Sequence, residues 1–176
     1  MSVNGADETP MTAPGVISTA DGSKYLERSR AEAFLGLVRA GDDLVRSLDK
    51  SLQKRSGLGL HQFEVLLFLG VFAKDGTMRL SDIRQSLPLS QSRVSRVVTE
   101  LESRGLVARS GDPEDSRAVL VTILDDGVEL FKSAQDPHLD DLDELLFSHL
   151  TDEEIHQLGA ICEKLLGRSV LGKGGA

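Results

Sequence analysis

The fold is decided by the stretch from residue 80 to residue 105, which reads LSDIRQSLPLSQSRVSRVVTELESRG. Its first part predicts a short helix that closes at Pro88, because proline lacks the backbone N–H that a continuing helix needs. Ser90 is a good N-cap for a second helix, since its hydroxyl can accept a hydrogen bond from a free backbone N–H of the first turn. Gly105 is the expected stop of that helix. The stretch therefore predicts two consecutive helices joined by a short turn.

A β-hairpin is predicted directly after these helices. Two short runs rich in β-branched residues occupy residues 106–110 and 118–123, and the segment GDPEDSR lies between them at residues 111–117. Glycine, aspartate and proline are typical turn residues, and β-branched side chains favour extended backbone. Helix, turn, helix and hairpin follow one another in a winged helix-turn-helix, whose second helix enters the major groove of DNA.

Helical periodicity accounts for most of the remaining chain. Apolar residues recur at intervals of three and four over residues 26–55, and residues 61–73 are apolar on nearly all sides, which is typical of a central core helix. The helical period returns after the hairpin, with Pro137 as an expected kink or break. Thr151 and Glu154 have the spacing of a capping box at the start of the last helix. The sequence predicts a mainly α fold with a small β-hairpin wing.

The outward face of the second helix carries the chemistry of DNA recognition. Its predicted buried stripe consists of Val94, Val97, Val98 and Leu101. The candidate DNA contacts, which are polar and lie outside that stripe or at the N-cap, are Ser90, Gln91, Ser92, Arg93, Ser95, Arg96 and Thr99. Glutamine and arginine can make paired hydrogen bonds to adenine and guanine edges, while serine and threonine reach bases or phosphates. This face predicts double-stranded DNA as a partner.

The acidic charge of the chain belongs to one region. The formal net charge is −8, yet residues 125–154 hold eleven acidic residues against Lys132 alone, a local charge of −10. The rest of the chain therefore carries +2. An overall acidic balance does not exclude DNA binding, because the placement of charge decides where an anion can approach.

The two ends and the single cysteine suggest how the chain is organised. Residues 1–25 are rich in Gly, Pro, Ser, Thr and Ala without apolar periodicity, so we expect a disordered tail, and residues 169–176 predict a second flexible tail. No stretch resembles a targeting or membrane segment. Cys162 has no disulfide partner in the chain and fits a reducing compartment. We expect a single domain over residues 26–168 in a cytoplasmic protein.

Four segments together resemble the MarR family of bacterial transcription regulators. These segments, which follow the family's order and spacing, are LGLHQFEVLLFL, LPLSQSRVSRVVTELESRGLVAR, GDPEDSR and LTDEEIHQLGAICEKL. The resemblance spans about residues 31–166. It implies a homodimer through helices at about 28–56 and 125–167, with a winged unit at about 60–123 that binds a pseudo-palindromic operator. It also implies a repressor that in many members responds to a small-molecule effector.

The chain departs from the family pattern at two places. Ser116 stands where members commonly have an arginine, and Glu114 lies close by, so the wing tip is less cationic than usual. At the start of the helix after the wing, Leu124 stands where a threonine would cap, and Asp125 is the expected replacement cap.

Arg117 is the candidate DNA contact of the wing, and two interpretations of its surroundings stay open. Asp112 or Asp115 could hold its guanidinium and orient it for a minor groove, so both acids are candidate wing supports. Alternatively, Asp112 and Pro113 merely form a turn, and Arg117 makes a surface salt bridge of little energetic value. The preceding helix and the family resemblance favour the first interpretation.

The terminal helices carry apolar stripes that exceed what a small winged unit can cover. The stripe of the first helix that we expect a partner chain to bury consists of Leu44, Leu48 and Leu52, and that of the last helix consists of Leu158, Ile161 and Leu165. Both stripes predict dimerisation.

Other functions have weaker support in the sequence. Surface or capping roles are favoured over a metal site for the four histidines, His61, His138, His149 and His156, because no two of them have zinc-ligand spacing. Cys162 fits a small buried apolar residue better than a redox sensor. We find no nucleophile with a base, no pair of catalytic carboxylates and no phosphate loop, so we expect neither an enzyme nor a cofactor. A winged helix that contacts proteins instead of DNA is the alternative.

Overall fold

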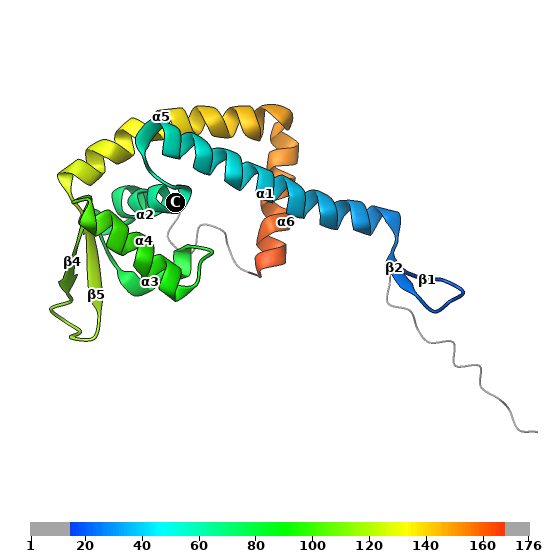
Figure 1. The fold of residues 1–176 in the computed structure, drawn as a ribbon, viewed down its shortest axis with the longest axis horizontal. Helices are drawn as coiled ribbons and strands as arrows, with labels where there is room; N and C mark the ends of the chain where they lie inside the picture. The colour runs from blue at the N-terminus through cyan, green and yellow to red at the C-terminus, as the bar shows by residue number, and fades with distance from the viewer. Residues whose placement is uncertain (1–14, 168–176) are drawn as a thin grey trace, which may run out of the picture. The chain divides into compact units, whose positions relative to one another are not determined.

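The computed structural model describes residues 15–167 (Figure 1). The described chain forms two compact units, one ending at Asp43 and one beginning at Leu44, where the sequence predicted a single domain over residues 26–168. The long helix α1 (Arg28–Ser56) contributes to both units.

The first unit contains a small hairpin and the first part of α1. Strands β1 (Val16–Ser18) and β2 (Lys24–Leu26) pair antiparallel. The Asp21 carboxylate shapes the turn between them, because it accepts from the backbone N–H of Ser23 at 3.0 Å and from the Thr19 hydroxyl. The tail expected over residues 1–25 is thus an ordered hairpin in its second half, and its first 14 residues lie outside the described part. The predicted tail at residues 169–176 lies outside it as well.

The second unit contains the winged helix-turn-helix. Its elements up to the wing are α2 (Leu60–Leu67), the π-helical turn η1 (Phe68–Phe72), the short turn η2 (Lys74–Gly76), β3 (Thr77–Arg79), α3 (Leu80–Ser86), α4 (Gln91–Ser103), β4 (Val107–Gly111) and β5 (Val119–Ile123). This arrangement confirms the mainly α fold with a wing. The sequence missed β3, which pairs antiparallel with β5 and gives a three-stranded sheet in the order β3-β5-β4.

Helix α4 begins and ends where the sequence placed its boundaries. Ser90 is the N-cap, and its hydroxyl accepts from the backbone N–H of Arg93 at 3.4 Å. Gly105 follows the helix with φ +71°, a left-handed conformation that glycine adopts without strain. Leu106 then donates its backbone N–H to the Leu101 carbonyl at 3.0 Å, which closes the helix end.

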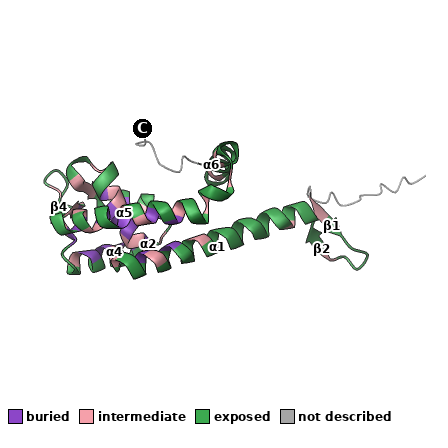
Figure 2. Ribbon diagram, turned by 90° about the horizontal axis from the view of Figure 1, so that it is seen from above, coloured by how far each residue is buried: buried purple, intermediate pink, exposed green. Residues whose placement is uncertain are grey.

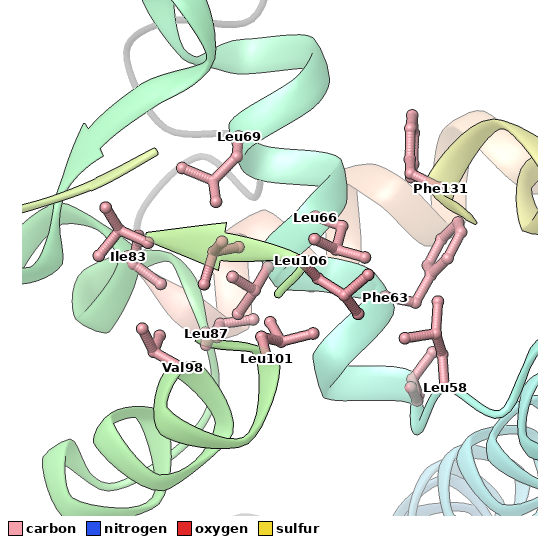
Figure 3. Packing of buried hydrophobic residues seen from close by; sticks show 14 of the residues in the cluster. Leu58, Phe63, Leu66, Leu69, Ile83, Leu87, Val98, Leu101, Leu106 and Phe131 are labelled. Atoms are coloured by element: carbon pink, nitrogen blue, oxygen red, sulfur yellow. The ribbon is translucent and has the colours of Figure 1, made fainter. Parts of the chain in front are cut away.

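The core determines which face of α4 points outward. Val94, Val98 and Leu101 are completely buried, as predicted, and Val97 is partly buried against the same core. Figure 3 shows Val98 and Leu101 packed near Leu106 and side chains of α2. Because this stripe is held inside, the opposite side of α4 must face solvent or a ligand.

Helix α5 (Asp125–Leu145) begins without the predicted aspartate cap. Leu124 is the N-cap and makes no side-chain capping bond, while Asp125 is the first helical residue. Its junction is instead fixed by backbone packing: Leu124 donates its N–H to the Leu106 carbonyl at 3.0 Å, and a Cβ at Gly127 would lie 2.2 Å from that oxygen. Pro137 lies inside α5 and does not break it.

The last elements are the short turn η3 (Phe147–His149) and helix α6 (Asp152–Leu166). The predicted capping box is confirmed, because Glu154 donates its N–H to the Thr151 hydroxyl at 3.4 Å and Thr151 donates its N–H to the Glu154 carboxylate at 2.8 Å. Across residues 15–167, no helix combines the length and apolar character of a membrane span.

Candidate nucleic-acid interface

The first turns of α4 present exposed polar side chains. Gln91, Ser92, Arg93 and Arg96 are exposed. Within residues 15–167, neither the Arg93 nor the Arg96 guanidinium has a hydrogen bond or an ion pair. Two unpaired cations on one exposed helical face, with no acid in the first two turns, form a surface that attracts an anion.

Two of the predicted contacts, Ser95 and Thr99, make hydrogen bonds within the protein. Ser95 is half-buried, and its hydroxyl accepts a hydrogen bond from Arg84 Nη2 at 2.8 Å. Thr99 donates its hydroxyl hydrogen to the Ser95 carbonyl at 2.8 Å and accepts from Arg109 Nη2 at 2.8 Å. The Thr99 hydroxyl therefore has its only hydrogen committed inside the unit.

The Arg109 side chain connects the wing to α4. Besides Thr99, its guanidinium reaches the Ser95 carbonyl at 3.0 Å and the Glu102 carboxylate at 3.2 Å. Its backbone N–H also donates to Glu102 at 3.1 Å. The first strand of the wing is thus attached along the middle and end of α4. Arg109 belongs to a segment that resembles the family motif, but nothing in the sequence indicates that its side chain contacts these residues of α4.

The acids of the wing form its turn. Asp112 accepts from the backbone N–H of Glu114 at 2.9 Å and pairs with Arg79 of β3 at 2.7 Å. These two partners, the backbone N–H first, lower the pKa of the Asp112 carboxyl below its ordinary value. Asp115 accepts from the backbone N–H of Arg117 at 3.0 Å.

The predicted orientation of Arg117 by these acids is wrong. Among the described residues, the Arg117 guanidinium has no hydrogen bond or ion pair with Asp112 or Asp115. The cation that Asp112 holds is Arg79, because β3 pairs with β5 and brings its last residue to the base of the wing. Arg79 was not among the predicted site residues, because β3 was not predicted. Arg117 itself is exposed at the end of the wing turn.

The histidines and Cys162, for which the sequence disfavoured a metal or redox role, lie at separate places in the structure. His61 pairs with Glu64 at 2.7 Å, His156 contacts the Asp152 carbonyl at 2.7 Å, and His149 is exposed. Over residues 15–167, no group of three His, Cys, Asp or Glu side chains is arranged to hold a metal ion. Cys162 is half-buried, although the sequence favoured a buried position.

His138 is an exception to the predicted surface or capping role. Its ring is buried against Phe63 at a centroid separation of 4.5 Å, and its Nδ1 has no hydrogen-bond partner among the described residues. Burial lowers the pKa of His138, while the nearby carboxylates of Asp141 and Glu64 oppose that shift. Asp141 is itself buried and accepts from the Ser51 hydroxyl at 2.5 Å.

The chain has sequence relatives that match this architecture. Residues 56–118 fit the sequence model of the MarR family. A relative from Bacillus subtilis, the HTH-type transcriptional regulator YxaD, is 31% identical over 107 residues, which are 61% of this chain and 73% of the relative. The chain belongs to the MarR family. Its winged unit is therefore that of a family of transcription regulators.

Two solved MarR-type structures extend the likeness to most of the chain. Sco3205 from Streptomyces coelicolor, solved in complex with DNA, has a TM-score of 0.78 at 24% identity and aligns over 82% of this chain and 90% of that one, which shows the shared fold. CouR from Rhodococcus jostii, solved with bound p-coumaroyl-CoA, has a TM-score of 0.66 at 26% identity over 78% of this chain and 92% of that one. Over most of the chain, the fold is therefore that of a MarR regulator.

Proposed function

We propose that this MarR-family transcription regulator binds a pseudo-palindromic operator as a homodimer, with α4 in the major groove and the wing at the minor groove. The observation that carries the proposal is the face of α4 on which Gln91, Arg93 and Arg96 are exposed while the opposite stripe is buried. Unpaired arginines on a short, exposed helical face suit base edges and phosphates. Arg117 supplies a further free cation from the wing.

The apolar surface of the terminal helices supports the homodimer. On α1, the exposed apolar side chains include Phe34, Leu37 and Val38, and on α6 they include Ile161 and Leu165. Figure 2 shows that most of α1 and α6 is coloured as exposed. Surface of this kind is normally covered by another chain. The predicted stripe on α1 needs correction, because Leu48 and Leu52 are buried in the chain's own core and Leu44 packs against it. The exposed residues N-terminal to Leu44 take their place in the proposed interface.

The proposal also includes repression and its control by a small-molecule effector. The structure of CouR holds p-coumaroyl-CoA, and we propose by likeness that this chain also responds to a small organic ligand. A dimer that occupies an operator blocks access of other proteins to the same DNA, which is the physical basis of repression. The cytoplasmic location expected from the sequence stays a prediction.

A winged unit that contacts proteins is less well supported. Protein interfaces are anchored by aromatic and large apolar side chains at their centre. The exposed residues of the first two turns of α4 are instead glutamine, serine and arginine. This composition favours DNA as the partner.

Two measurements test the proposal. Purified protein is incubated with random double-stranded fragments, and the bound DNA is recovered and sequenced over several rounds. We expect an enriched inverted repeat. Light scattering of the free protein at micromolar concentration is expected to give the mass of a dimer. Failure to enrich any sequence would contradict operator binding, and the mass of a monomer would contradict the dimer.

A further inference from the structure

The Arg84 side chain is half-buried and lies beside α4. It comes from the last turn of α3, and its Nη2 donates to the Ser95 hydroxyl on α4 at 2.8 Å. Its Nε is buried and has no hydrogen-bond partner among the described residues. The inner edge of the guanidinium is thus enclosed, and its outer Nη2 is hydrogen-bonded to α4.

The Ser95 hydroxyl differs from its neighbour Thr99 in where its hydrogen goes. Thr99 donates its hydrogen to a backbone carbonyl within α4. Ser95 accepts from Arg84, and across residues 15–167 its own hydrogen has no acceptor. A hydroxyl that already accepts a hydrogen bond from a cation is polarised, which makes its hydrogen a better donor. The hydrogen of the Ser95 hydroxyl is thus available to an acceptor on another molecule.

We propose that Ser95 donates a hydrogen bond to an acceptor on one base edge of the operator, and that Arg84 is the positioning residue that orients it. This inference rests on the proposed binding of DNA through α4. The acceptors available in the major groove are guanine O6 and N7, adenine N7 and thymine O4. Ser95 lies in the second turn of α4, within the N-terminal part of the helix that contacts base edges in this motif.

Removing the Ser95 hydroxyl also takes away the hydrogen-bond acceptor of Arg84 Nη2, so thermal denaturation of each variant accompanies the binding measurements. Fragment selection is carried out with the wild type, with Ser95→Ala and with Ser95→Thr, which keeps a hydroxyl. We expect Ser95→Ala to lose the preference at one base pair of each half-site and to bind the selected operator about 3- to 10-fold less tightly per half-site. Affinity for a scrambled sequence is expected to stay the same, and Ser95→Thr is expected to keep the preference.

Arg84→Met tests the positioning role, because methionine keeps an aliphatic stem without the guanidinium. We expect it to relax the preference at the same base pair as Ser95→Ala, and the double variant to lose no more than either single one. The dependence of affinity on salt should keep its slope, whereas loss of a phosphate contact would reduce it by about 1 per subunit.

Several results would overturn the inference. An unchanged selected sequence and affinity for Ser95→Ala would remove the role of Ser95. An equal loss on selected and scrambled DNA would assign Ser95 to a phosphate. A reduced salt slope for Arg84→Met, with the base preference intact, would make Arg84 a phosphate contact. If the wild type enriches no sequence, operator binding itself fails; the other outcomes leave it standing.

Discussion

The winged unit and the terminal helices differ in how far their apolar side chains are buried. Val94, Val98 and Leu101 of α4 are completely buried within one chain, whereas Phe34 of α1 is 57% exposed and Leu165 of α6 is 66% exposed. Both regions have helical periodicity of similar clarity in the sequence. The difference shows that periodicity identifies an apolar face but does not tell whether the chain's own core buries it.

The largest effect is expected when acidic residues are introduced into the exposed apolar face of α6. We expect Ile161→Glu combined with Leu165→Glu to prevent dimerisation at micromolar concentration, because each apolar side chain buried at an interface contributes about 1.5–3 kcal/mol. Light scattering measures the mass. Lys164→Glu changes the net charge by the same amount on the same helix and should stay dimeric. A double variant that remains a dimer would remove α6 from the interface.

Substitutions on the buried face of α4 should lower the stability of the fold and leave dimerisation unchanged. Leu101→Ala is expected to lower the free energy of unfolding by about 2–5 kcal/mol, since it removes a fully buried side chain and leaves a cavity. Urea denaturation measures the loss, and light scattering should still give a dimer. A loss below about 1 kcal/mol would show that the core around Leu101 collapses or is loosely packed.

The outward face of α4 should respond in DNA binding alone. Arg93→Ala and Arg96→Ala are each expected to weaken operator binding by about 1–3 kcal/mol where a base contact is lost, with little change in the thermal midpoint. Electrophoretic or fluorescence titration measures affinity, and thermal denaturation serves as the control. If neither substitution changes affinity, the assignment of α4 as the recognition helix is wrong.

The wing should contribute a smaller, less specific share. We expect Arg117→Ala to lower affinity and to reduce the slope of its salt dependence, because one cation fewer meets the phosphates of each half-site. The preference for the selected bases should persist. Asp115→Asn is expected to act in the same direction but more weakly, since Asp115 holds the Arg117 backbone and not its guanidinium. Unchanged affinity and slope for Arg117→Ala would make the wing a structural hairpin only.

The smallest expected effect concerns the pH dependence of stability. Burial lowers the pKa of His138 in the folded chain below the unfolded value of about 6.5, so the unfolded chain binds more protons as the pH falls. Stability should therefore be complete above about pH 6.5 and decline below it. Thermal midpoints between pH 7.5 and 5 measure this decline. His138→Gln should flatten it, and an equally steep decline in that variant would assign it to other groups.

Local signals in the sequence were sufficient for much of the fold. The cap at Ser90, the stop at Gly105 and the capping box of Thr151 depend on residues within one or two turns of each other, and all three are confirmed. Strand β3 escaped prediction because three residues, Thr77–Arg79, are too few to show alternation. The hairpin of residues 15–26 was not predicted, because the composition of residues 1–25 as a whole favoured a disordered tail over the local turn residues.

The details of the site depended on contacts between distant segments. The sequence identified the polar face of α4, but nothing near Ser95 indicates that Arg84 and Arg109 reach it from α3 and β4. The partner of Asp112 is 33 residues away on a strand that was not predicted. His138 is buried because α5 packs on α2, which the period of α5 alone does not reveal.

The close packing at Gly127 limits which residues can occupy this position. A side chain at this position would collide with the carbonyl oxygen of Leu106, at the point where α4 passes into the wing. That same oxygen accepts the N–H of Leu124, so the start of α5 and the end of α4 are joined through a single backbone group. Any residue with a Cβ would therefore force the start of α5 away from the Leu106 carbonyl. Because that oxygen belongs to the backbone, no change of side-chain rotamer can relieve the collision, and we expect this position to accept glycine alone.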